Sequence, residues 1–174
     1  LAFYRLREDM GEEALNRALA KFISAKAFQT APYTTSVELI AFLRAEAAPE
    51  TQQLITDLFE KISFYDNRVE EASAVKQANG KYLVTIKTHA DKRYADGTGK
   101  ETPAAMQDFI EVGVYAGSGK DTRTLYLKRE HITTSKPEFT VLVDELPSEA
   151  GFDPNNKLID RVSVDNRKKI SIGD

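Results

Sequence analysis

The spacing of hydrophobic residues changes once along this chain, near Phe64. Before that point apolar side chains recur every three or four residues, which is the period of an amphipathic α-helix. After it they alternate with polar side chains, which is the period of a β-strand with one buried face. The two periods predict an α+β chain, with a helical segment over residues 1–64 and a β-rich domain over residues 65–174.

About four helices are expected in the first segment. Residues 3–10 carry a helical pattern that Gly11 is suited to stop, and the carboxylates that follow suit the positive end of a second helix. Thr35 and Glu38 have the spacing of a capping box, which starts a third helix. Pro49 is suited to the first turn of a fourth helix.

In the second segment, the alternation of apolar and polar side chains predicts strands over residues 69–76, 81–90, 109–115, 124–131 and 139–144. Asn79-Gly80 lies between the first two and predicts a hairpin with a type I′ turn, in which both central residues need positive φ. Ile110, Val112 and Val114 are expected to point inward. Five to seven antiparallel strands with turns at this density predict an immunoglobulin-like β-sandwich.

Charge and composition exclude several classes of function. The chain has 24 basic and 27 acidic residues, and neither segment has the positive excess that nucleic-acid binding needs. There are no cysteines, which excludes disulfides and thiolate chemistry. No apolar run approaches the ~18 residues that span a bilayer, so we expect this chain to be soluble and not membrane-inserted. The basic run Arg167 to Lys169 is interpreted as a solvated tail.

The chain begins at Leu1, without an initiator methionine and already in helical rhythm. A native N-terminus rarely begins inside an amphipathic pattern. We therefore expect the chain to be a fragment of a longer polypeptide.

The chain has only two histidines, His89 and His131, both in predicted strands. A zinc-hydrolase helix needs two histidines one turn apart with a glutamate between them, so that the imidazoles converge on the metal. His89 and Asp91 share a strand face and could bind a stray metal ion, but we interpret them as surface polar residues. No GxSxG nucleophile elbow occurs. The sequence thus predicts no catalytic residue and no metal ligand.

The glycines around Lys120 are similar in composition to a phosphate-binding loop. That motif needs a glycine five positions before its Gly-Lys pair, where Val114 stands, and a hydroxyl residue after the lysine, where Asp121 stands. We interpret the segment as a loop between two strands of a hairpin.

Residues 150–161 combine turn-forming residues, two amides and alternating charges around a short apolar core. Asp153 can close an Asx-type turn before Pro154, and Asn156 can bond nearby backbone. The segment is interpreted as an ordered turn that leads into an edge strand or, alternatively, as a docking site for a neighbouring domain. The candidate docking residues are Asp153, Asn156, Lys157, Asp160 and Arg161.

Three stretches carry a resemblance to a known family. The first contains Met10-Gly11-Glu12-Glu13-Ala14-Leu15-Asn16-Arg17-Ala18-Leu19, and the second is Ala31-Pro32-Tyr33-Thr34-Thr35-Ser36-Val37-Glu38-Leu39. The third is the more distinctive Gly151-Phe152-Asp153-Pro154-Asn155-Asn156-Lys157-Leu158-Ile159-Asp160-Arg161. Together they resemble zinc metallopeptidases of the aminopeptidase N type (gluzincins), in a bacterial branch often fused to transporter-permease-like membrane helices.

The resemblance implies that this chain is the non-catalytic C-terminal part of such a peptidase and is inactive alone. The family's HExxH helix, its third-ligand glutamate and its transition-state tyrosine all precede the matching residues. Zinc and the peptide substrate would therefore belong to the parent protein, which would be membrane-tethered in bacteria. Residues 1–28 would close the upstream catalytic domain of the same chain, and the sandwich would shape substrate access or dock a partner.

A second hypothesis belongs to a different class of protein. An immunoglobulin-like sandwich with a helical preface can be a free-standing module that binds protein or glycan through its loops. The two hypotheses differ in what lies upstream of Leu1, because only the first requires an in-frame HExxH with a downstream glutamate.

Overall fold

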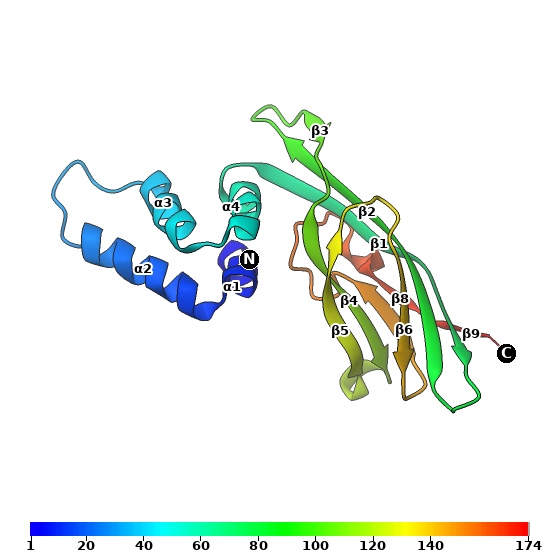
Figure 1. Cartoon of the computed structure of the whole chain (residues 1–174). Coiled ribbons are helices and arrows are strands. Elements are labelled where there is room, and N and C mark those ends of the chain that lie inside the picture. The colour runs from blue at the N-terminus through cyan, green and yellow to red at the C-terminus, as the bar shows by residue number, and fades with distance from the viewer. Residues whose placement is uncertain (174) are drawn as a thin grey trace. The chain divides into compact units, whose positions relative to one another are not determined.

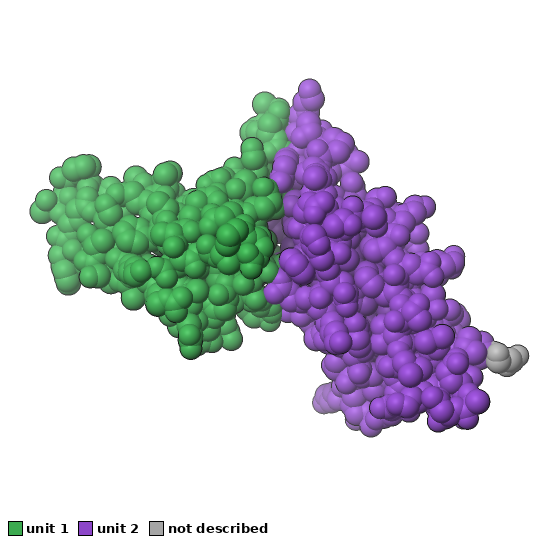
Figure 2. All heavy atoms as spheres, in the orientation of Figure 1, with its two compact units in different colours: residues 1–63, 95–99 green, residues 64–94, 100–174 purple. Residues whose placement is uncertain are grey.

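The computed structural model describes residues 1–173, and the chain divides into two compact units. Unit 1 comprises residues 1–63 and 95–99, and unit 2 comprises residues 64–94 and 100–174 (Figure 2). Each unit has its own buried apolar cluster. The boundary expected after residue 64 falls inside a strand that begins at Ile62.

Unit 1 contains the four helices expected from the sequence (Figure 1). A 3₁₀ turn at Pro49–Thr51 precedes the fourth helix, so the proline does stand at a helix start. One stripe of apolar residues from each helix forms the buried cluster of this unit: Leu6, Leu15, Ala18, Leu43, Leu54 and Ile55. The helices are α1 (Ala2–Met10), α2 (Glu12–Lys26), α3 (Ser36–Glu46) and α4 (Gln52–Phe59).

The capping box predicted at the start of α3 is confirmed. The backbone N–H of Thr35 donates to the Glu38 carboxylate at 3.0 Å. The Lys26 ammonium, the Thr34 hydroxyl and this N–H all bind the carboxylate and lower the pKa of Glu38 to about 2. A charge at this position also suits the positive end of the helix dipole.

Unit 2 is built from two sheets (Figure 1). The first sheet has the order β3-β2-β1-β9, with β6 also paired to β2. Its strands are β1 (Ile62–Lys76), β2 (Tyr82–Ala95), β3 (Glu101–Pro103), β6 (Glu138–Val143) and β9 (Ser171–Gly173). The second sheet has the order β5-β4-β7-β8, with β4 (Asp108–Ala116), β5 (Arg123–Ile132), β7 (Glu149–Phe152) and β8 (Arg167–Lys169).

The second sheet is antiparallel throughout, but the first is mixed because β9 runs parallel to β1. The wholly antiparallel arrangement expected from the sequence is therefore wrong at this strand pair. One buried apolar cluster takes residues from both sheets, among them Val84 and Ile86 of β2. Ile110, Val112 and Val114 of β4 belong to the same cluster, as their alternation predicted.

The hairpin between β1 and β2 is confirmed, but its predicted turn type is wrong. Gly80 has a φ of 83°, whereas Asn79 is not among the residues with positive φ. The N–H of Gly80 donates to the Gln77 carbonyl at 2.9 Å, and that of Gln77 donates to the Lys81 carbonyl at 2.8 Å. This is the pattern of a β-turn followed by a left-handed glycine in a G1 bulge.

The basic run at residues 167–169 forms β8, so its interpretation as a solvated tail is wrong. The Arg167 guanidinium lies 3.0 Å from the Glu149 carboxylate and donates from Nε to the Pro154 carbonyl at 3.1 Å. It also lies 4.7 Å from the centroid of the Tyr115 ring. Across residues 1–173, none of the helices combines the length and the apolar character that crossing a lipid bilayer requires.

Candidate functional site

Asp153 organises the loop that follows β7. Its φ is 49°, and its side chain is buried, with the residue 1% exposed. One carboxylate oxygen accepts the backbone N–H of Lys157 at 2.9 Å, and the other accepts that of Leu158 at 3.0 Å. Asp153 thus closes a wider turn than the Asx-type turn expected from the sequence, and it satisfies two N–H groups that would otherwise be buried without partners.

Further contacts hold the first half of this loop, residues 153–157, against the rest of unit 2. The Lys157 ammonium is buried and lies 2.6 Å from Glu111 of β4. The Asn155 amide donates to the other oxygen of the same carboxylate at 2.8 Å. The buried Asn166 amide donates to the Asp153 carbonyl at 3.2 Å. The loop is therefore fixed to the second sheet and to the segment before β8.

Backbone conformation restricts two more positions of the loop. A Cβ at Gly151 would lie 2.6 Å from the Cβ of Pro154, so the proline can pack here only against a glycine. Asn156 has a φ of 51° and an exposed side chain, and asparagine tolerates this left-handed conformation better than most residues. These restrictions account for much of the unusual composition of residues 151–157.

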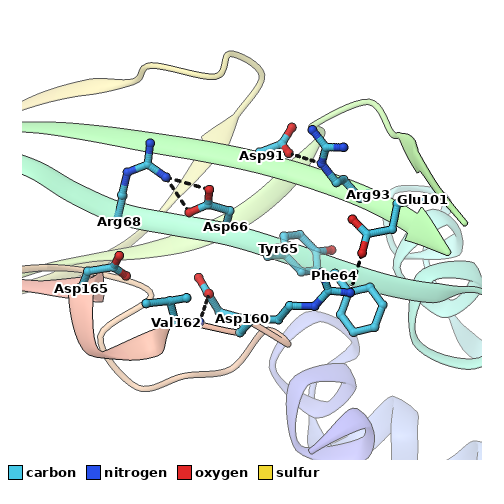
Figure 3. A pocket seen from close by; sticks show the side chains of 11 residues that line it. Phe64, Tyr65, Asp66, Arg68, Asp91, Arg93, Glu101, Asp160, Val162 and Asp165 are labelled. Atoms are coloured by element: carbon cyan, nitrogen blue, oxygen red, sulfur yellow. Dashed lines mark hydrogen bonds and ion pairs between the residues drawn. The ribbon is translucent and has the colours of Figure 1, made fainter. Parts of the chain in front are cut away.

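The second half of the loop lines a pocket of about 440 Å³ in unit 2 (Figure 3). Residues 160–165 form one wall, and the start of β1 forms the wall opposite. The end of β2 and Glu101 of β3 complete the lining. The backbone N–H of Tyr65 donates to the carbonyl of Ile159 at 2.9 Å. This hydrogen bond holds the loop alongside β1 and fixes the position of one wall relative to the other.

Buried polar contacts hold the side chain of Tyr65 in place. Its hydroxyl donates to a carboxylate oxygen of Asp108 at 3.0 Å, and the buried Lys92 ammonium lies 3.0 Å from the other oxygen. Buried charges of this kind need a partner, because an unpaired ion inside a protein is costly. This pair fixes the β1 wall to both sheets, since Lys92 lies on β2 and Asp108 on β4.

Arg161 lies across one end of the pocket. Its guanidinium lies 2.5 Å from the Glu101 carboxylate and 4.0 Å from the centroid of the Phe64 ring. The ring face attracts the cation, and the carboxylate neutralises it. Both contacts hold a side chain that is otherwise more than half exposed.

The other two guanidinium groups of the pocket also have carboxylate partners. Nη1 of Arg68 donates to both oxygens of Asp66 at 2.7 Å, and Arg93 donates to Asp91 at 2.7 Å. Each pair lies two residues apart on one strand, so both members project from the same face of the sheet. These pairs form the upper wall in Figure 3.

Two carboxylates of the pocket differ from the rest. Asp160 accepts the backbone N–H of Asn67 at 2.7 Å and that of Val162 at 2.8 Å, so backbone donors satisfy it. One carboxylate oxygen of Asp165 is buried and has no hydrogen-bond partner among the described residues. Burial raises the pKa of Asp165, and the negative charges of Asp160 and Asp66 raise it further.

The five candidate docking residues therefore separate into two groups. Asp153, Asn156 and Lys157 stabilise the loop, whereas Asp160 and Arg161 line the pocket. Their role in docking stays a prediction. Asp91, interpreted from the sequence as a surface polar residue, also lines the pocket. Sequence reasoning missed the following lining residues, although their spacing of two along predicted or adjoining strand segments is a usable signal: Phe64, Asp66, Arg68 and Arg93.

The two histidines of this chain contact other groups. His89 lies 3.8 Å from Asp66, but the oxygens of that carboxylate bind Arg68. His131 stacks on Phe109, with ring centroids 4.8 Å apart. Within residues 1–173, no three side chains of the metal-binding types are grouped to hold an ion. The glycine-rich segment at residues 117–121 connects the antiparallel strands β4 and β5, as its interpretation as a hairpin loop predicted.

Sequence comparisons give this chain no family. The chain matches no protein-family model, and no curated protein matches it. The geometry of the loop and the pocket is therefore the main physical basis on which a function can be argued.

Proposed function

We propose that this chain is the non-catalytic C-terminal part of a zinc metallopeptidase of the aminopeptidase N type. In this proposal unit 2 is an immunoglobulin-like sandwich that docks a polypeptide partner at the pocket or shapes access to the substrate. The order of the elements supports the proposal, because four helices precede a unit of two sheets. The resemblance in the sequence implies the same order.

The position of Asp160 and Arg161 is the observation that carries the proposal. These residues end the segment on which the most distinctive part of the resemblance rests, and both line the pocket. The first half of the segment is held by buried contacts, so the pocket wall is formed before any partner binds. A preformed surface binds with a smaller loss of conformational entropy than a flexible one.

The proposal assigns the chemistry to residues outside this chain. Zinc and the peptide substrate belong to the upstream catalytic domain, where a metal can polarise a peptide carbonyl and activate water. The helices of unit 1 would support that domain. No step of hydrolysis is assigned to a residue of this chain.

The test compares the 174-residue chain with the longer polypeptide that contains it. Zinc content is measured by elemental analysis, and activity by hydrolysis of aminoacyl p-nitroanilides. We expect one zinc per chain and activity in the longer polypeptide and neither in the 174-residue chain. Stoichiometric zinc with peptidase activity in the 174-residue chain would overturn the proposal, and so would an upstream reading frame without HExxH.

A variant of the longer polypeptide tests the role of the pocket. Arg161→Ala removes the contacts with Glu101 and Phe64, and we expect lower peptidase activity with an unchanged zinc content. Arg123→Ala is the matched control, because Arg123 forms a similarly exposed pair with Glu145 at 2.7 Å outside the pocket. Equal effects of the two substitutions would contradict a docking role for this wall.

A free-standing binding module is the second candidate function. The pocket favours it, because an aromatic ring next to several charged groups is a common composition for recognition of protein or glycan. In that case the reading frame upstream of Leu1 would encode no metal site, and the pocket would bind its ligand without any neighbouring domain.

A further inference from the structure

The charges that line the pocket do not balance. The lining contains five carboxylates and three guanidinium groups. Each guanidinium has its own carboxylate partner within the lining: Arg68 with Asp66, Arg93 with Asp91, and Arg161 with Glu101. The two carboxylates that remain are on the loop wall, at residues 160 and 165.

Of these two carboxylates, Asp165 is the less satisfied. Both oxygens of Asp160 accept backbone N–H groups. Asp165 has a buried oxygen without a hydrogen-bond partner among the described residues. Leaving a buried acceptor unsatisfied is costly, and more so when the group is charged. That oxygen is closed to solvent, so a ligand would meet the carboxylate on the side that lines the pocket and would compensate its charge there.

The surroundings of Asp165 restrict the chemistry of the donor. Figure 3 shows Asp165 on the loop wall, across the pocket from Asp66 and Arg68. Asp160 and Asp66 repel an anion from this position, and a neutral hydroxyl would leave the excess negative charge in place. A metal ion does not fit, since no three metal-binding side chains of residues 1–173 are grouped around one point. A cationic nitrogen supplies both the hydrogen bond and the missing charge.

The size and the apolar part of the pocket restrict the donor further. A volume of about 440 Å³ is within the range of about 300–1,000 Å³ that is usual for ligand pockets, and it exceeds what one small cation fills. Val162 lines the pocket next to the two loop carboxylates. Lysine and arginine carry long apolar stems that pack on such side chains while their charged ends reach a polar group.

We propose that the pocket binds an arginine or lysine side chain of a polypeptide partner, with Asp165 as the carboxylate that receives its charged end. The proposal rests on the docking role given to the pocket above and names the chemistry of the partner. It assigns to Asp165 a function in recognition, whereas Asp66, Asp91 and Glu101 hold the arginines of the pocket in place.

The test uses the full 174-residue chain, labelled with ¹⁵N, and three capped tripeptides. Their central residues are arginine, its neutral isostere citrulline, and glutamate. We expect the arginine peptide to shift the backbone amide signals of residues 66–68 and 160–165 in a saturable manner. The citrulline peptide should bind about tenfold more weakly, because a charge-assisted hydrogen bond is roughly twice as strong as a neutral one.

Two variants connect the binding to Asp165. Asp165→Asn keeps the shape of the side chain and removes its charge, and we expect about a tenfold loss of affinity for the arginine peptide. Asp144→Asn is the matched control, because Asp144 is 80% exposed, pairs with Lys81 and lies outside the pocket. We expect the control to bind the arginine peptide as the unchanged chain does.

Three results would overturn the proposal: no saturable shift with the arginine peptide, equal binding of the citrulline peptide, or an unchanged affinity of Asp165→Asn. Stronger binding of the glutamate peptide would instead indicate a pocket for anions. The measurement requires no zinc and no upstream domain. It can therefore fail while the metallopeptidase test succeeds, and the reverse also holds.

Discussion

Residues 153–157 and residues 160–165 belong to one loop, but they differ in what their charged side chains contact. In the first group, Asp153 and Lys157 are 1% and 7% exposed, and both bind groups of this same unit. In the second group, Arg161 is largely exposed, and Asp165 has a carboxylate oxygen without a partner. Both groups are similar in charge and polarity in the sequence, so composition does not separate a buried, stabilising segment from one that lines a pocket.

The difference between the two groups is one of energetic role. A buried, fully bonded carboxylate such as that of Asp153 contributes to stability through the backbone groups that it satisfies. A carboxylate such as that of Asp165 costs stability in the isolated chain, because it is partly desolvated and the charge of Arg68 offsets this only in part. Side chains that cost stability are typical of functional sites. Substitutions in each half of the loop test whether it divides in this way.

Replacement of Asp153 is expected to have the largest effect. Asp153→Ala leaves the backbone N–H groups of Lys157 and Leu158 without their acceptors, and we expect a loss of about 3 kcal/mol in the free energy of unfolding. Urea denaturation measures it. Asp144→Ala, at an exposed carboxylate, should change the same quantity by less than about 0.5 kcal/mol. Similar values for both variants would remove the distinction between the two halves of the loop.

The packing of Pro154 against Gly151 gives the next effect. Gly151→Ala places a Cβ 2.6 Å from the Cβ of Pro154, and overpacking of this kind costs about 1–3 kcal/mol. Gly97→Ala is the control, since a Cβ there meets no atom within 4 Å and the residue does not have a positive φ. A drop in melting temperature is expected for the first variant only. An equal response would show that the loop adapts to the added methyl group.

Asp165→Asn should raise the free energy of unfolding at neutral pH. The gain should be smaller than the losses expected for Asp153→Ala and Gly151→Ala. The pKa of Asp165 is raised in the folded state by burial, by Asp160 and by Asp66, and Arg68 opposes this only in part. The ionised carboxylate therefore destabilises the fold above its folded pKa, and the penalty disappears as pH falls to the ordinary pKa of aspartate. Urea titrations at several pH values should show a gain that shrinks on acidification. A loss of stability at neutral pH would assign Asp165 a structural role.

The smallest effect on stability is expected at Arg161. Its pair with Glu101 is exposed on the arginine side, and such pairs contribute about 0–1 kcal/mol. We expect Arg161→Ala and the control Arg123→Ala to lower the free energy of unfolding by similar amounts, each below about 1 kcal/mol. A loss of several kcal/mol at Arg161 alone would place this residue with the stabilising half of the loop.

Long periodic elements could be predicted from the sequence, and short ones could not. The four helices and the cores of β1, β2, β4, β5 and β6 follow from repeated spacing. Strands β3, β7, β8 and β9 have three or four residues each, too few for a period to be recognised. The basic residues of β8 were interpreted as a tail because their partners, Glu149 and the Pro154 carbonyl, lie on a strand and a loop that the pattern does not place beside them.

The pocket could be predicted only in part for a related reason. Asp160 and Arg161 stand in a segment of unusual composition, which marked them as candidates. Asp66 and Arg68 lie on β1, and Asp91 lies on β2, so their meeting depends on strand register. In a hairpin the register follows from the turn type, and the turn type predicted for this hairpin was wrong. Whether the charge of Asp165 is compensated depends in turn on which arginines pair with the other carboxylates.

The bond between the Asn67 N–H and Asp160 joins positions 93 residues apart in the chain. Contacts of such sequence separation form late, because a long stretch of flexible chain must be ordered before they are made. During synthesis, β1 therefore leaves the ribosome well before its facing wall exists. The pocket therefore exists only after residues 160–165 have been made and have packed against β1.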